Sequence, residues 1–179
     1  MESLIWVDCE MTGLDVQKHH IIEIAVMITD KDLNIIAEGP DIIIHKSKEF
    51  LDQTMEPWSK EHHEKSGLTA KVLSSTISTQ EATQQILSFI KHHIPKPRIA
   101  PLAGNSVGYD RAFLAKEMPE VIDWCHYRVV DVSSIKELAR RWYPSVYENA
   151  PIKKYTHRAL SDIKESIEEL KYYRKNVFK

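Results

Sequence analysis

Residues 4–11 read Leu-Ile-Trp-Val-Asp-Cys-Glu-Met, an apolar run that Thr12 and Gly13 end. Its length and its glycine-marked end predict a buried strand. Two acids, Asp8 and Glu10, interrupt the run two positions apart. Since alternate side chains of a strand share a face, both carboxylates would lie on one face, roughly 6–7 Å apart along the strand.

The acidic pair is the first sign of a functional site. Apolar side chains alternate with the two acids, so the opposite face of the strand is expected to join a core. Two like charges on one face of a buried strand repel each other, and burying them is costly without a cation. A divalent metal ion would remove that cost. The alternative is an edge strand with a solvated acidic face.

Two more strands are predicted directly after the first. Residues 21–29 are apolar, and a turn at residues 30–32 separates them from a third strand over residues 33–45. This third strand is expected to bend near Gly39 and Pro40. Short turns between three consecutive strands indicate an antiparallel meander.

The rest of the chain alternates helices with strands. Helices are predicted to start at Pro57 and at two capping boxes, Ser78 with Glu81 and Ser134 with Glu137. Further elements are strands over 99–104 and 127–132, a helix that stops at Pro119, and a last helix with apolar Leu160, Ile163, Ile167 and Leu170. The pattern predicts one α/β domain over residues 1–179, with a five-stranded mixed sheet flanked by helices.

Bulk composition narrows the kind of protein. The 179 residues carry a formal net charge of −2, which tells against a protein that grips long nucleic acid, although a small nucleic-acid substrate fits. Cys9 and Cys125 are too few for a disulfide framework, which favours a reducing compartment. No apolar run approaches the ~20 residues of a membrane span. The first strand begins so early that we expect no targeting segment within these residues, and removal of a presequence before residue 1 stays open.

Three later residues carry weaker signals when taken singly. Asp110 follows a turn-forming stretch, residues 104–108, at a strand-to-helix junction, where α/β sheets often bind ligands. An acid favoured by the helix dipole is the simpler explanation for Asp110 alone. Asp162 is expected in the second turn of the last helix, and His157 in the loop before it, where a histidine is usually a surface residue.

Taken together, these residues follow the order D-x-E, N-x4-D and H-x4-D, which resembles the DEDDh exonuclease superfamily. Five longer blocks resemble its oligoribonuclease family over almost the whole chain: residues 6–14, 104–110, 126–133, 137–142 and 157–162. The resemblance implies a ribonuclease H-like, DnaQ-like exonuclease fold. It also implies 3′→5′ hydrolysis of very short RNA, chiefly dinucleotides, to 5′-mononucleotides, which would complete RNA degradation.

A two-metal mechanism is part of the same resemblance. Two Mg²⁺ or Mn²⁺ ions, which prefer oxygen ligands, would lie about 3.5–4 Å from each other and hold the scissile phosphate between them. The implied ligands are Asp8, bridging both ions, with Glu10, Asp110 and Asp162. His157 would take a proton from the attacking water.

Substrate contacts also follow by resemblance. Leu14 would wedge between the bases and Trp58 would stack on them, while Ser106, Arg128, Ser133 and Ser134 would cap the terminal 5′ phosphate. Sequence alone leaves Trp58 equally a core anchor and makes Ser134 a helix cap first. Tyr127 matches a tyrosine that the partner protomer supplies, which implies a homodimer. Asp131 is interpreted as structural, and the histidine pairs 62–63 and 92–93 as solvated helix residues.

Other functions stay open at this point. One is a DEDDh exonuclease acting on longer RNA or on DNA, such as a proofreading subunit or a trimming nuclease, which the near-neutral charge disfavours. Another is an inactive RNA-binding module, which the intact set of site residues disfavours. Residues 60–68 and 176–179 resemble the eukaryotic small-fragment nucleases of the family, so a mitochondrial or cytoplasmic location is expected, and a cytoplasmic one if the chain is bacterial.

Overall fold

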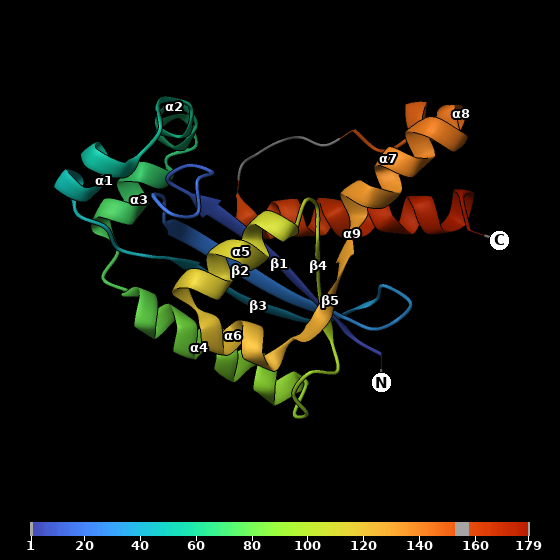
Figure 1. The fold of residues 1–179 in the computed structure, drawn as a ribbon, viewed down its shortest axis with the longest axis horizontal. Helices are drawn as coiled ribbons and strands as arrows, with labels where there is room; N and C mark the ends of the chain where they lie inside the picture. The colour runs from blue at the N-terminus through green and yellow to red at the C-terminus, as the bar shows by residue number, and fades with distance from the viewer. Residues whose placement is uncertain (1, 153–157, 179) are drawn as a thin grey trace.

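A single mixed sheet organises the protein, in a computed structural model that describes residues 2–152 and 158–178 (Figure 1). Its strand order is β3-β2-β1-β4-β5, with the first strand of the chain at the centre. The strands are β1 (Leu4–Met11), β2 (Ile21–Thr29), β3 (Ile35–Ile43), β4 (Pro101–Gly104) and β5 (His126–Asp131). The five-stranded mixed sheet with flanking helices is the predicted architecture, so that prediction is confirmed.

Pairing within the sheet puts β1 between an antiparallel and a parallel neighbour. β1 pairs antiparallel with β2 and β2 with β3, which confirms the predicted meander. β4 lies parallel to β1 on its other side and parallel to β5. In this register Asp8 lies opposite Ala25 and Glu10 lies opposite Glu23. The alternative of a solvated edge strand is therefore wrong, because β1 is central.

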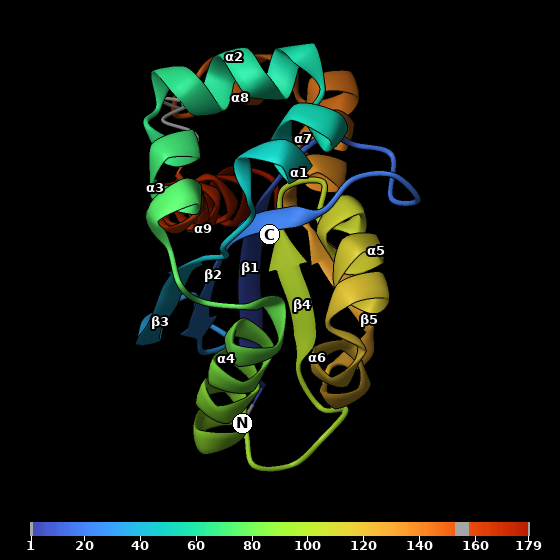
Figure 2. The same cartoon turned by 90° about the vertical axis from the view of Figure 1, so that its left-hand side faces the viewer.

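Helices cover both faces of the sheet (Figures 1 and 2). One face is covered by α4 (Thr79–His93), α5 (Gly108–Glu117) and α6 (Pro119–Trp124), the other by α7 (Val132–Trp142) and α9 (Ala159–Asn176). The shorter α1 (Lys48–Thr54), α2 (Pro57–Lys65) and α3 (Leu68–Ser74) gather where β1 ends, and α8 (Pro144–Glu148) packs beside α7. Along the described chain we find no helix with the length and apolar character that a membrane span needs.

The alternation along β1 divides its side chains between two cores. Ile5, Val7 and Cys9 join the core under α4 and α5, whereas Trp6 joins the core under α9. Asp8 and Glu10 have the parity of Trp6, so they point to the α9 face. The site is consequently enclosed between β1 and the last helix.

The helix starts differ from the predictions in one instructive place. The capping box of Ser78 and Glu81 is present with both of its hydrogen bonds. The box predicted for Ser134 and Glu137 is wrong, because α7 begins at Val132 and the extended Asp131 caps it by accepting from the Ser133 amide. Glu137 instead lies within a salt-bridge distance of two arginines of the same helix, Arg140 and Arg141.

Candidate active site

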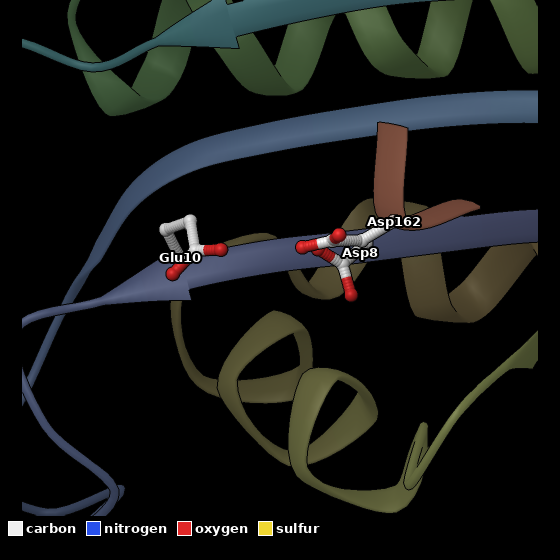
Figure 3. Close-up of side chains that lie close together, drawn as sticks. All are labelled: Asp8, Glu10 and Asp162. Carbon is white, nitrogen blue, oxygen red and sulfur yellow. The ribbon is translucent and has the colours of Figure 1, made fainter. Parts of the chain in front are cut away.

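Three carboxylates from two elements meet between β1 and α9 (Figure 3). Asp8 and Glu10 project from β1, and Asp162 comes from the first turn of α9, one turn earlier than predicted. One oxygen of each carboxylate lies within 4.8 Å of the other two. Divalent cations with a preference for hard oxygen ligands suit such a donor set.

The fourth predicted carboxylate, Asp110, reaches β1 from the first turn of α5. β4 pairs with β1 only through Ile5 and Trp6, which leaves the later backbone of β1 open on that side. There the Cys9 amide donates to Asp110 Oδ1 at 2.9 Å. Asp110 is buried and its charge raises the pKa of Asp8, but it is not one of the three carboxylates whose oxygens lie within 4.8 Å of one another.

Burial makes these carboxylates reluctant to ionise. Burial raises the pKa of Asp8 well above its usual range, and the charges of Asp110 and Glu10 raise it further. The pKa of Glu10 is raised to about 8, chiefly by burial and then by the charge of Glu23. Burial raises the pKa of Asp110 to about 7 against the hydrogen bond from Cys9. The site thus holds more negative charge than its own surroundings neutralise, which fits a cation.

A falling stability with rising pH is expected for the metal-free protein. In the folded state Glu10 and Asp110 keep protons up to about pH 8 and about pH 7, whereas their ordinary values are 4.5 and 3.8. Between these limits the folded state binds more protons than the unfolded chain, so the free energy of unfolding decreases as pH increases. In EDTA we expect the melting temperature to fall from about pH 5 to about pH 8.

Other groups of the protein also titrate in that window, so the Glu10→Gln variant serves as the control. At each pH, the melting temperature of this variant is subtracted from that of the wild type, and the difference isolates the contribution of Glu10. A difference that stays flat across the window would contradict the raised pKa. Saturating Mn²⁺ is expected to remove the fall in the wild type.

Two charged residues that the sequence did not single out lie beside the site. Glu23, in the register opposite Glu10, is fully buried, and burial raises its pKa to about 7. Arg158 donates its Nε to Glu23 Oε1 at 3.0 Å and also approaches that oxygen with Nη2 at 3.0 Å. The available signal was a single glutamate inside the otherwise apolar strand of residues 21–29.

His63 corrects a second interpretation. It was expected to be a solvated helix residue, but it is only 2% exposed because α2 packs over the end of β1. Its Nε2 lies 2.9 Å from the Met11 carbonyl, and its Nδ1 lies 3.9 Å from Glu10. Its neighbour His62 is half-buried and stacks on Trp58, whereas His92 and His93 are exposed as predicted.

The two predicted base contacts are exposed near the end of β1. Leu14 and Trp58 expose 61% and 60% of their surface, so the alternative of Trp58 as a core anchor is wrong. The loop that carries Leu14 is fixed by Lys116, which donates to the Val16 and His19 carbonyls at 2.7 and 3.1 Å. The amide of Glu56 donates to the Thr12 carbonyl and so ties the start of α2 to the same loop.

Two of the four predicted phosphate contacts are organised by Asp131. Its Oδ1 accepts from the amides of Ser106 and Ser133, both at 2.9 Å, and the hydroxyls of these serines lie 3.2 Å apart. This is the structural role expected for Asp131. A cavity of about 460 Å³ opens here, lined by Val16, Ser106, Gly108, Tyr109, Ala112 and Asp131.

The remaining predicted residues lie on the outer strand and the helix after it. Arg128 and Tyr127 are exposed on β5, with the guanidinium 5.1 Å from the centre of the tyrosine ring. Ser134 lies in the first turn of α7. His157 lies outside the described residues, so its predicted place beside the carboxylates is untested.

The chain is similar to known exonucleases over almost its whole length. A family model described as an exonuclease, RNase_T, matches residues 5–170. The chain is 56% identical over 178 residues to the mitochondrial oligoribonuclease of Homo sapiens, covering 99% of this chain and 74% of the relative. It is 51% identical to the oligoribonuclease of Rhodococcus jostii over 99% of this chain and 88% of that one. The Mg²⁺- and Mn²⁺-bound structure of S. pombe Pop2p has the same fold, with a TM-score of 0.73 at 16% identity over 98% of this chain and 84% of that chain.

Proposed function

The chain belongs to the exonuclease family and, within it, to the oligoribonucleases, and from that membership we infer an enzyme that degrades short RNA by 3′→5′ exonucleolytic hydrolysis. We propose that its main substrates are dinucleotides, which it converts to 5′-mononucleotides. The observation that supports hydrolysis is the convergence of Asp8, Glu10 and Asp162 between β1 and α9. Their number and partial burial suit phosphodiester hydrolysis assisted by divalent cations.

Two cations, Mg²⁺ or Mn²⁺, are the proposed cofactors. Asp8, Glu10, Asp110 and Asp162 would hold them, and the raised pKa values of the first three support a site that lacks positive charge. Bound ions would stabilise the negative charge that develops on the phosphate and its attacking and leaving oxygens. The protein's part is to fix the carboxylates on a central strand and two helix starts.

Proton transfer and phosphate binding are assigned to other side chains. We propose that His157 accepts the proton of the attacking water, since an imidazole of near-neutral pKa suits that task. Asp131 already occupies the amides of Ser106 and Ser133, and the Ser133 hydroxyl donates to Asn105 Oδ1 at 3.0 Å, so contact of the two hydroxyls with a 5′ phosphate would replace that hydrogen bond. Arg128 and Ser134 would complete the cap, with the guanidinium supplying a charge-assisted contact.

Short substrates are favoured by the position of the exposed side chains. Leu14 lies three residues after the end of β1 and Trp58 lies on α2, which packs over that end. Base stacking on an aromatic ring contributes about 1–3 kcal/mol per base. The serines of the phosphate cap follow the carboxyl ends of the neighbouring β4 and β5, whereas Arg128 lies within β5. A substrate held at both places would be one of a few nucleotides.

A homodimer is proposed to complete the site. Large apolar side chains are exposed on β5, α7 and the residue after α7: Tyr127, Val129, Leu138, Trp142 and Tyr143. Such a surface on an outer strand is typical of a subunit interface. Tyr127, at 69% exposed, would reach the active site of the other protomer. A mitochondrial or cytoplasmic location remains the proposal for the compartment.

Hydrolysis of a length series of 5′-phosphorylated RNA, from two to about twenty nucleotides, tests the substrate proposal. We expect the specificity constant to be highest for the dinucleotide and to fall with length, because longer chains add phosphates that this near-neutral protein has few cations to meet. A specificity constant that is independent of RNA length, or that rises with it, would instead indicate an exonuclease of longer RNA. Binding without cleavage in the presence of Mn²⁺ would indicate an inactive RNA-binding module.

A further inference from the structure

A half-buried arginine joins the last helix to the sheet beside the carboxylates. Arg158 approaches Glu23 Oε1 at 3.0 Å with both Nε and Nη2, and Nη2 lies 3.8 Å from Asp41 Oδ2. Glu23 is fully buried on β2, and the side chains of Asp41 and Arg158 are each 27% exposed. We call these three residues, Glu23, Asp41 and Arg158, the Arg158 clamp.

The clamp is connected to the proposed metal site at both ends. On the helix side, Arg158 is the N-cap residue of α9, and its carbonyl accepts from the Asp162 amide at 3.0 Å. One rigid helical turn therefore links the arginine to the carboxylate. On the sheet side, Glu23 lies opposite Glu10 in the ladder.

Electrostatics explains why such a link is needed. In their ionised forms Asp8 and Glu10, which share the face of β1 towards α9, are repelled by the charge of Asp162. This repulsion acts to push the start of α9 away from the sheet. The guanidinium, which bonds Glu23 and also favours the ionised form of Glu10, opposes it.

We propose that Arg158 is a positioning residue that, through Glu23 and Asp41, holds Asp162 at the spacing from Asp8 and Glu10 that a divalent cation requires. The inference rests on the proposed function, because it concerns the same metal site. It assigns no contact with substrate to Arg158. Residues that orient metal ligands in this way typically change metal affinity by 10–100-fold when they are replaced.

The test compares Arg158→Met, which keeps a flexible unbranched side chain but removes its charge, with Arg158→Lys. Binding of Mn²⁺ to the protein without RNA is measured by calorimetric titration, beside kcat and KM for a diribonucleotide. We expect the dissociation constant for Mn²⁺ to rise about tenfold or more in Arg158→Met and less in Arg158→Lys. At saturating Mn²⁺, kcat should fall while KM changes little, since the proposed base and phosphate contacts lie elsewhere.

A matched control exists on the same helix. Lys164 pairs with Glu38 of β3 at 2.9 Å, and both side chains are about half exposed. This pair also joins α9 to β3, but it lies further along the helix than Asp162. Lys164→Met should leave Mn²⁺ affinity unchanged, and an effect equal to that of Arg158→Met would contradict a specific role for the clamp.

A second variant distinguishes two roles of Arg158: positioning Asp162, and neutralising the buried charge of Glu23. Removing Arg158 alone leaves the buried Glu23 without its cation, which lowers stability by itself. The double variant Glu23→Gln/Arg158→Met removes both charges, so its melting temperature should recover towards that of the wild type. We expect its Mn²⁺ affinity to stay low; recovery of both properties would overturn the proposal and leave Arg158 a structural residue.

Failure of the clamp and failure of the proposed function give different results. Titration with Mn²⁺ in the absence of RNA measures the effect of the clamp on metal affinity, and this result does not depend on the substrate. A wild-type protein that binds Mn²⁺ but does not cleave a diribonucleotide would refute the function alone. Equal Mn²⁺ affinity in wild type and Arg158→Met would refute the clamp alone, and should that variant not fold, the double variant and Arg158→Lys carry the same comparison.

Discussion

Replacing Asp8 with asparagine is expected to lower kcat for a diribonucleotide by about 10³-fold or more. Asp8 lies on the central strand among four other acids, and it is the proposed ligand shared by both cations. Cations that polarise a phosphate contribute several kcal/mol, and about 4 kcal/mol corresponds to roughly 10³-fold in rate. Steady-state kinetics at saturating Mg²⁺ measures the effect.

The melting temperature of the metal-free variant shows whether unfolding causes the loss of activity. Because burial and neighbouring charges disfavour the ionised form of Asp8, the asparagine variant should melt no lower than the wild type in EDTA. Wild-type turnover in this variant would contradict the ligand assignment. A loss of activity with a collapsed melting temperature would indicate a structural role instead.

The same variant tests whether Tyr127 acts across a dimer. If it does, a mixture of Asp8→Asn and Tyr127→Ala subunits forms heterodimers with one site in which both residues are intact. Random exchange of subunits would then restore about a quarter of the wild-type sites, although each variant alone is nearly inactive. A mixture that stays as inactive as its components would contradict action in trans.

Replacing His157 with alanine is expected to leave Mn²⁺ binding intact while kcat falls about 10²-fold or more. The reason is that the imidazole is proposed to handle the proton of the attacking water and not to hold the cations. Calorimetric titration and steady-state kinetics on the same preparation measure the two properties. Near-normal turnover would contradict the role of His157 as the proton acceptor. Loss of Mn²⁺ binding would indicate that His157 is instead a metal ligand.

Most of the fold follows from local sequence signals. β1 and β2 have the predicted limits, since an apolar run bounded by turn residues defines a strand without tertiary information. The short helices α1, α3, α6 and α8 were not predicted, because five to seven residues are too few to display helical periodicity. The start of α7 was misplaced because two possible capping residues, Asp131 and Ser134, lie three positions apart.

The site was less predictable than the fold, for a physical reason. Asp8 and Glu10 are recognisable since two acids interrupt an apolar strand, and their approach to Asp162 required only that the last helix cross β1. Glu23, His63 and Arg158 were missed because their roles depend on strand register and helix packing. Glu23 faces Glu10 only in the observed ladder, and His63 is buried only because α2 covers the end of β1.

The most direct test of this account is the turnover of a 5′-phosphorylated diribonucleotide, with and without Mg²⁺. Complete conversion to 5′-mononucleotides in Mg²⁺, its abolition by EDTA and its recovery with added Mn²⁺ are the predicted results. A twenty-nucleotide RNA in the same assay should be degraded more slowly. Failure to cleave the diribonucleotide with either metal, under conditions that degrade the longer RNA, would contradict the account.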